Sequence, residues 1–144
     1  MRISTKGRYA LRMLLDLAEH REQGYTALKE VAQRQNISQR YLEQILPLLA
    51  AGRLLQAQRG AQGGYRLARN PADVRVGYIL RLTEGDLCPV ACLAEEAEEC
   101  ERRGVCTTLP VWKGLERVIN DYLDGITLVD ILRERAGEEA LAGS

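Results

Sequence analysis

The sequence predicts a mainly α-helical fold with one small β-hairpin, followed by a longer helix in the C-terminal third. Apolar residues recur at helical spacing through most of the first fifty positions. Two short apolar-rich runs then flank the glycine-rich residues 59–64, a pattern typical of a hairpin turn. A third stretch, residues 109–123, has an apolar arc broader than one small domain can cover.

Two helices are predicted in the first 36 residues. The first covers residues 3–19, after the cap candidates Ser4 and Thr5, and its apolar face is formed by Tyr9, Ala10, Met13, Leu14, Leu17 and Ala18. The same helix carries three cations that could reach phosphates: Lys6, Arg8 and Arg12. Thr26 is the predicted N-cap of a second helix at residues 27–35, which Asn36 can end.

A third helix is predicted to begin after Ser38, whose hydroxyl can accept a hydrogen bond from a first-turn amide. Its inner face is set by apolar residues at helical spacing: Tyr41, Leu42, Ile45 and Leu46. Its remaining side chains can hydrogen-bond to base edges: Gln39, Arg40, Glu43 and Gln44. Pro47 removes a backbone donor, so we expect a kink or an end near Leu46 and a further turn closed by Gly52.

The glycine-rich residues join two predicted strands, residues 54–58 and 65–67, into a hairpin. Two short helices joined by a turn form a helix-turn-helix unit, and a hairpin directly after it is a wing. A brief helix is predicted at residues 76–83. Residues 1–85 are therefore predicted to form a winged helix-turn-helix DNA-binding domain.

The rest of the chain divides into a cysteine-containing loop and two helices. Residues 86–108 hold all four cysteines and are predicted to be a sensor loop with about one helical turn. The next helix has Pro110 in its first turn, after Thr107 or Thr108 as cap, and ends at Gly125. Its apolar arc comprises Val111, Leu115, Val118 and Tyr122, widened by Trp112, Ile119 and Leu123.

Such a helix is suited to pairing with a second copy of the chain, which makes residues 109–133 the predicted dimerisation region. The alternative is that the helix packs back on its own domain. Thr127 and Asp130 form a capping box for a last short helix through Leu132. Residues 134–144 are predicted to be a frayed tail.

Composition favours a folded cytoplasmic protein with a polyanionic partner. The chain has 144 residues, is 46% hydrophobic and lacks an apolar run that could span a membrane. Its net charge of zero hides a segregation: residues 1–82 hold 14 Lys+Arg against 6 Asp+Glu, and residues 83–144 hold 6 against 14. A front half of charge +8 suits DNA phosphates, whereas the alternative is a chance imbalance on solvated faces.

An enzyme is not predicted. The single histidine, His20, leaves no Ser/His/Asp set, and a position at a helix end suits a charge near the dipole. The sequence has no phosphate-binding loop. Residues 60–65 do not form a dinucleotide fingerprint, because no βαβ unit surrounds them.

The cysteines lie at Cys88, Cys92, Cys100 and Cys106, a spacing that differs from the paired CxxC of zinc ribbons and from ferredoxin patterns. Spacing alone therefore leaves several interpretations open. They are an iron–sulfur centre, zinc, a disulfide or thiol switch, and reduced cysteines without metal.

Several motifs, which follow one another along the chain, resemble those of the Rrf2 family of bacterial transcription regulators. They are MRISTKGRYALRMLLDLA, ISQRYLEQIL, RGAQGGYRLAR, and the cysteines followed by VW and DGITLVDIL. The resemblance covers about residues 1–132. It implies a dimeric winged-helix DNA binder, in many members with a [2Fe–2S] cluster.

The resemblance also implies roles for individual residues. Ser38, Arg40, Tyr41, Glu43 and Gln44 match the family's DNA-reading helix, where Glu43 could accept from cytosine and Gln44 could pair with adenine. Arg59 matches the wing arginine that enters the minor groove. The wing glycines Gly60, Gly63 and Gly64 would let the backbone approach DNA.

Cys92, Cys100 and Cys106 match the family's three-cysteine cluster motif. The fourth ligand is open, because Leu109 and Arg8 stand where relatives have a histidine or an acidic residue. The alternatives are Cys88, an exogenous thiol or water, and one of Glu98, Glu99 and Glu101. We therefore predict a repressor-type homodimer that binds a palindromic operator and senses iron–sulfur, redox or nitric oxide status. The alternative is a cluster-free regulator controlled by a thiol switch, a small molecule or a partner protein.

Overall fold

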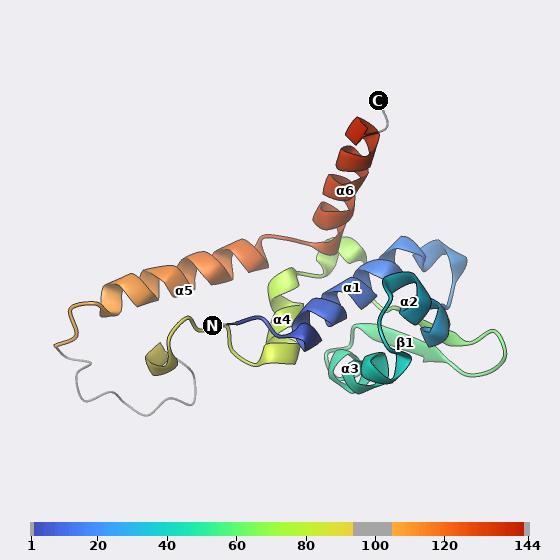
Figure 1. Ribbon diagram of the computed structural model, residues 1–144, viewed down its shortest axis with the longest axis horizontal. Helices are drawn as coiled ribbons and strands as arrows, with labels where there is room; N and C mark the ends of the chain where they lie inside the picture. Colours follow the sequence, from blue (N-terminus) through green and yellow to red (C-terminus); the bar gives the residue numbers. More distant parts are fainter. Residues whose placement is uncertain (1, 94–104, 143–144) are drawn as a thin grey trace.

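The computed structural model describes residues 2–93 and 105–142, and it consists of helices and one small hairpin that lies at one end of the molecule (Figure 1). This confirms the predicted class, a mainly helical fold with a two-stranded antiparallel sheet. None of the helices in these ranges has the length and apolar character needed to cross a membrane. The elements in chain order are α1 (Thr5–Glu19), η1 (Arg21–Gln23), α2 (Leu28–Gln35), α3 (Gln39–Ala51), β1 (Leu55–Gln58), β2 (Gly64–Leu67), η2 (Pro71–Asp73), α4 (Val76–Glu84), η3 (Ala91–Leu93), α5 (Leu109–Asp124) and α6 (Leu128–Ala142).

The main core lies where α1 crosses α3, the hairpin and α4. Met13 and Leu14 of α1 and Ile45 of α3 are fully buried, in agreement with the helical spacing of the sequence. Each such side chain contributes about 1.5–3 kcal/mol of transfer free energy on burial. A second cluster centres on Leu80 and Leu87 and joins α1 and α4 to α5.

The start of α1 is held by the last residue of α4. Ser4 is the N-cap, as predicted, and its hydroxyl accepts a hydrogen bond from the amide of Gly7 at 3.4 Å. Glu84 adds a second acceptor, because its Oε1 receives the Ser4 amide at 3.1 Å, the Ser4 hydroxyl at 2.5 Å and the Gly7 amide at 3.1 Å. A Cβ at Gly7 would lie 2.3 Å from that oxygen, so a larger residue here would displace the Glu84 carboxylate from the start of α1.

A buried carboxylate joins α1 to the end of α2. Asp16 is only 2% exposed and accepts from Arg34 Nη2 at 2.6 Å, from Arg34 Nε at 3.0 Å and from Gln35 Nε2 at 3.0 Å. Burial alone would raise the pKa of Asp16. The hydrogen bonds from Arg34 and Gln35, with the charges of Arg34 and His20, outweigh burial and lower this pKa below its ordinary value of 3.8.

The boundaries of α2 and α3 differ from the sequence prediction in two places. Thr26 is not the cap of α2, because it pairs as an isolated bridge with Tyr65 of β2, through two backbone bonds of 2.8 Å, and Ala27 takes the cap position. The predicted end of α3 near Leu46 is also wrong, since the helix runs through Pro47 to Ala51. Core burial on both sides of the proline offsets its missing hydrogen bond, and Gly52 closes the helix as predicted.

The last helix is longer than the sequence suggested, whereas α5 ends at Gly125 as predicted. The predicted capping box of α6 is confirmed, because the Thr127 amide donates to Asp130 at 2.9 Å and the Asp130 amide to Thr127 at 3.1 Å. The expected end at Leu132 is wrong, since α6 continues to Ala142 and projects from the body (Figure 1). Arg135 supports it by pairing with Glu19 of α1 at 2.9 Å, a contact between distant parts of the chain that local propensity does not reveal.

The charge pair at Asp16 generates a stability prediction. Asp16→Asn should lower the free energy of unfolding at neutral pH by about 2 kcal/mol, because it leaves the partly exposed Arg34 without its carboxylate. The folded-state pKa is depressed, so this stabilisation is complete above pH of about 4 and is lost as pH falls through the folded value. Urea unfolding of both proteins from pH 7 down to pH 2 measures the difference.

The control is Glu30→Gln, which removes an exposed carboxylate 3.9 Å from the same arginine. It should change stability by less than about 0.5 kcal/mol. An equal effect of the two substitutions, or an Asp16→Asn effect that persists unchanged at pH 2, would contradict this account.

Candidate nucleic-acid interface

One side of α3 is polar and open to solvent. Gln39, Arg40, Glu43 and Gln44 are all exposed, whereas Leu42, Ile45 and Leu49 on the opposite side are fully buried. The helical repeat places the four polar residues on one face, since positions three and four apart are neighbours. The structure therefore brings together four of the predicted base-reading side chains on a single exposed surface.

Ser38 and Tyr41 already make contacts within the protein. Ser38 Oγ accepts a hydrogen bond from the Tyr41 amide at 3.3 Å, which confirms the predicted N-cap of α3. The Tyr41 ring is half-buried and lies edge-on against Tyr9 of α1, with 5.4 Å between ring centroids. Ser38 therefore caps α3, and the Tyr41 ring fixes the position of this helix against α1.

The hairpin forms in the predicted place, with Leu55 opposite Leu67 and Gln58 opposite Gly64. Arg59 and Gly60 lie exposed at its tip, and Gly60 has φ +112° with open space around its Cα. The glycines at the other end of the turn have an internal reason. A Cβ at Gly63 would lie 2.1 Å from the Gln58 carbonyl oxygen, and one at Gly64 would lie 2.2 Å from that of Thr26.

The cations of α1 are divided between solvent and protein. Lys6 and Arg8 are exposed, whereas the guanidinium of Arg12 is held by Gln35. It donates to the Gln35 backbone oxygen and, at 3.3 Å, to the Gln35 side-chain oxygen, and it lies 5.2 Å from the Tyr9 ring centroid. Arg12 therefore supports the turn between α2 and α3, and only Lys6 and Arg8 have cationic groups open to a ligand.

Three of the four cysteines lie in the described ranges, and Cys100 lies outside them. Cys92 is exposed in the middle of η3, and Cys106 is half-buried just before α5. Cys88 donates its thiol hydrogen to the Leu93 carbonyl at 3.2 Å and approaches Glu116 of α5 at 3.8 Å. Burial and the acidic neighbours Asp86 and Glu116 raise the pKa of Cys88 to about 11, which disfavours the thiolate form that binds metal.

The donor chemistry suits iron–sulfur ligation, because thiolates are the usual protein ligands of such clusters. The geometry of the described cysteines does not yet form such a site. Among residues 2–93 and 105–142, no group of three or more His, Cys, Asp or Glu side chains lies close enough to hold a metal ion. Cys88 in particular contacts Glu116 instead of another cysteine.

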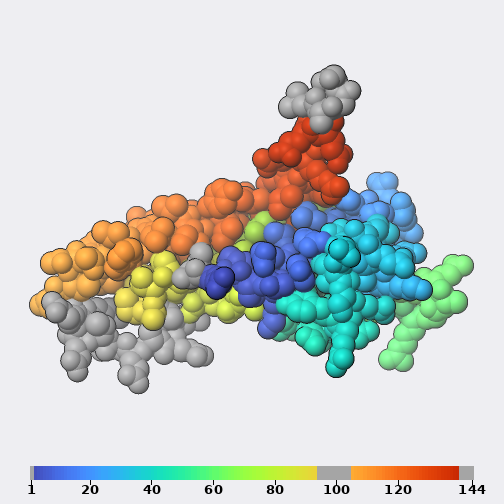
Figure 2. Space-filling model, in the orientation of Figure 1, coloured from blue at the N-terminus to red at the C-terminus, as the bar shows by residue number. Residues whose placement is uncertain are grey.

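The helix α5 extends from the body as a long arm (Figure 2) and keeps much of its apolar stripe in solvent. Val111 is 59% exposed, Leu115 41%, Val118 64% and Tyr122 66%. Its opposite side is anchored to α4, where Arg81 binds Asp124 at 2.7 Å and Asn120 at 2.6 Å. In a single chain these four residues do not pack on their own domain. The alternative in which the whole apolar arc packs back is therefore wrong for them.

Residues 3–134 match the family model Rrf2, described as an iron-dependent transcriptional regulator. The chain belongs to the Rrf2 family. It is 37% identical over 134 residues to protein rrf2 of Nitratidesulfovibrio vulgaris, covering 93% of this chain and 89% of that protein. It is also 37% identical over 139 residues to the HTH-type transcriptional regulator CymR of Bacillus subtilis, covering 96% and 95%.

Solved structures of Rrf2 proteins share the fold. T. potens IscR superposes with a TM-score of 0.75 at 38% identity, covering 94% of this chain and 88% of that one. The Bacillus subtilis CymR structure, described as that of the global cysteine regulator, gives 0.74 at 37% identity, covering 91% and 95%. The family model and the CymR and IscR relatives are described as transcriptional regulators, so this Rrf2 chain is a DNA-binding transcriptional regulator and not an enzyme, as the sequence predicted.

The polar contacts that hold α1 and α3 of this Rrf2 chain in place were not predicted from the sequence. Asp16 had a detectable signal, since it is a carboxylate between Met13 and Leu17 on the apolar face of α1. Glu84 had none, because its partners Ser4 and Gly7 are about eighty residues away.

Proposed function

We propose that the chain acts as a homodimeric repressor that binds a palindromic operator through α3 and the hairpin tip. The observation that carries this proposal is the exposed polar face of α3. The opposite face of the helix is fully buried, and Ser38 caps its N-terminus. A helix of this kind fits the major groove with its N-terminal residues toward the bases.

Individual roles follow from donor and acceptor chemistry. The Glu43 carboxylate accepts from a cytosine amino group, and the Gln44 amide can pair with both groups of an adenine edge. Ser38, Gln39, Arg40 and Tyr41 contribute further polar groups at the start of the helix. Arg59 enters an A·T-rich minor groove beside Gly60, where the open space around Gly60 permits close approach, and Gly63 and Gly64 keep the wing in shape.

The exposed stripe of α5 is the proposed dimer seam. A contiguous apolar surface on one helix is stabilised when a second copy covers it. The Arg81–Asp124 pair fixes α5 to α4, so pairing through α5 would hold two reading helices at a set separation. Successive major grooves on one side of DNA are about 34 Å apart, which defines the expected spacing of the half-sites.

The proposed signal acts through Cys92, Cys100 and Cys106, which would hold a [2Fe–2S] cluster together with a fourth ligand. Support comes from the match of these cysteines to the family motif and from the family's description as iron-dependent. When bound, such a cluster supplies a redox-active iron centre. Cys88 is a less suitable fourth ligand in this conformation, since its thiol is committed to Leu93 and Glu116.

The position of the cysteine segment suggests how a signal reaches DNA. Residues 86–108 begin two residues after Glu84, which caps α1, and end at Thr108, the N-cap position of α5. Leu87 is 3% exposed and anchors the segment between α1, α4 and α5. Gain or loss of a cluster in this segment would change the position of α5 relative to α3, and hence the distance between the two wings.

A second candidate is a regulator without a cluster, controlled by a thiol switch, a small molecule or a partner protein. Two observations favour it: the similarity to CymR, whose solved structure is described as a cysteine regulator, and the thiol hydrogen bonds of Cys88. Both candidates share the DNA-binding surface and differ in the signal.

Base reading by α3 can be tested once the preferred duplex has been selected from a random-sequence library. Glu43→Ala should relax the preference at one base pair of each half-site by about 1–3 kcal/mol, because a cytosine amino group loses its acceptor. Glu138→Ala removes the same group from the exposed side of α6 and should leave the preference intact. Identical base preferences for both variants and the parent protein would exclude this role of Glu43.

The dimer seam is tested by Val118→Glu, which places a charge in the exposed apolar stripe without disturbing a buried site. We expect dissociation to monomers in sedimentation equilibrium, because burial of an unpaired carboxylate at the seam costs several kcal/mol. Lys113→Glu, on the opposite side of α5, is the matched control and should remain dimeric. A parent protein that is monomeric at micromolar concentration would refute the seam.

The cluster is tested by preparing the protein without oxygen. We expect bound iron with visible absorption, and loss of both in Cys92→Ala. The iron-loaded protein should then differ in operator affinity from both the iron-free protein and Cys92→Ala. A colourless, iron-free preparation would support the second candidate, and equal affinity of all three forms would refute the coupling.

A further inference from the structure

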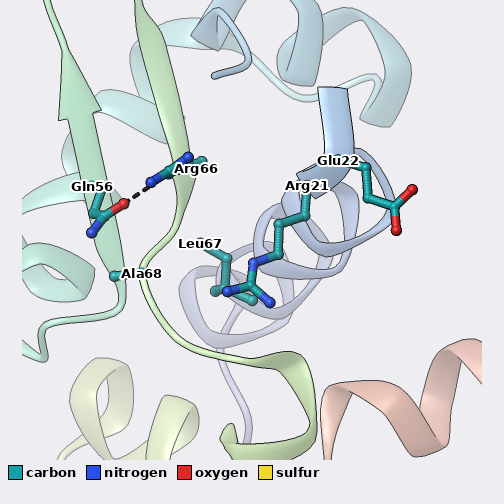
Figure 3. Close-up of a pocket in the computed structure, with 6 residues that line it drawn as sticks. All are labelled: Arg21, Glu22, Gln56, Arg66, Leu67 and Ala68. Atoms are coloured by element: carbon teal, nitrogen blue, oxygen red, sulfur yellow. Dashed lines mark hydrogen bonds between the residues drawn. The ribbon is translucent and has the colours of Figure 1, made fainter. Parts of the chain in front are cut away.

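A groove of about 370 Å³ lies between η1 and the base of the hairpin, apart from the exposed face of α3 (Figure 3). Two arginines from different elements contribute to it, Arg21 from η1 and Arg66 from β2. The complete lining is Arg21, Glu22, Gln56, Arg66, Leu67 and Ala68. None of these side chains has a role in the base-reading surface proposed above.

Arg66 is held in a defined orientation. Its Nε donates to Gln56 Oε1 at 2.7 Å across the hairpin, and its guanidinium lies 4.8 Å from the centroid of the Tyr25 ring. These two contacts fix the plane of the guanidinium, and they leave its two Nη groups without a protein acceptor in the part of the chain that the structure describes. An arginine restrained in this way loses little rotamer entropy when it binds an anion.

Arg21 supplies a second cation that lacks an acidic partner among the described residues. Its side chain lies over Leu67, within the groove (Figure 3). Glu22 also lines the groove, and its carboxylate points away from the other lining residues in the same view. The groove is therefore lined by two guanidinium groups and the single carboxylate of Glu22, and neither arginine forms an ion pair among the described residues.

This arrangement matches the chemistry of a phosphate group. Two guanidinium forks offer several N–H donors to oxygens of a tetrahedral anion, and the Gln56 amide nitrogen adds a neutral donor beside Arg66. Bringing two like charges to one groove is unfavourable unless an anion lies between them. We propose that this groove is a phosphate-binding site formed by Arg21, Arg66 and Gln56.

The position of the groove points to the DNA backbone as the first source of that phosphate. Gln56 and Arg66 form a cross-strand pair two residues from the Gln58–Gly64 pair that closes the hairpin tip, a distance of roughly 7 Å along the strand. A duplex that receives Arg59 in its minor groove would continue past the hairpin, where a flanking phosphate could reach the groove. This source rests on the proposed DNA-binding function, whereas a free phosphate or a phosphorylated small molecule does not.

The test uses the full-length protein and the selected operator in two lengths. One duplex ends at the outer edges of the half-sites, and the other extends about 10 base pairs further on each side. Arg21→Gln is the main variant, because Arg21 is exposed and its side chain makes no hydrogen bond in the described structure, so the fold should not change. Arg133→Gln removes the same charge from α6 and is the matched control.

For the long duplex, Arg21→Gln should bind about eightfold more weakly per subunit near 0.1 M salt, and the slope of log K against log salt should fall by about 0.9 per contact. Arg133→Gln should match the parent protein, and the short duplex should not distinguish the variants. Inorganic phosphate is titrated separately while the Arg66 Nε–H resonance is followed by NMR. A saturable shift that Arg21→Gln abolishes, with no effect of duplex length, would support the site with free phosphate as its source.

If Arg21→Gln behaves like the parent protein with the long duplex and inorganic phosphate causes no saturable shift, the proposed site is wrong. Failure of the parent protein to bind even the short operator would instead refute the proposed DNA-binding function. In that case the phosphate titration still decides whether the groove binds an anion.

Discussion

The position of the exposed polar face of α3 depends on one buried carboxylate. Asp16 lies on the inner face of α1, almost without solvent exposure, and accepts hydrogen bonds from the last two residues of α2, Arg34 and Gln35. Asn36 then turns the chain in the left-handed region at φ 53°, and α3 begins three residues later. An unpaired charge at this depth would be costly, so the pairing specifies where α2 ends relative to α1.

The same network reaches α3 by a second route. Arg12 holds the Gln35 carbonyl and stacks near Tyr9, and Tyr9 contacts Tyr41 edge-on. α1 thus supports the turn of the helix-turn-helix unit on both sides. Among the described residues, the exposed polar side chains of α3 make no hydrogen bond within the protein. This separation explains why α3 can present four polar side chains to a ligand while its other face forms the core.

The N-terminus of α1 links the helix-turn-helix unit to the rest of the chain. Glu84 caps α1, Leu87 packs between α1, α4 and α5, and Arg81 fixes α5 through Asp124. The cysteine segment follows Glu84 and precedes α5, so the proposed signal would act on both the helix that supports α3 and the proposed dimer seam. The two parts of the chain also differ in charge: residues 1–82, which include α3, are basic, and residues 83–144, which include α5, are acidic.

The sequence by itself determined the features that depend on residues close together along the chain. Helical periodicity, the Ser38 and Asp130 caps and the glycine-rich turn predicted the elements, the hairpin and the exposed face of α3, because each rests on contacts within about four residues. Only the tertiary structure decided the continuation of α3 through Pro47, the pairing of Thr26 with Tyr65 and the length of α6. Those outcomes depend on burial and on partners such as Glu19 for Arg135, which lie far apart in the chain and become neighbours only after folding.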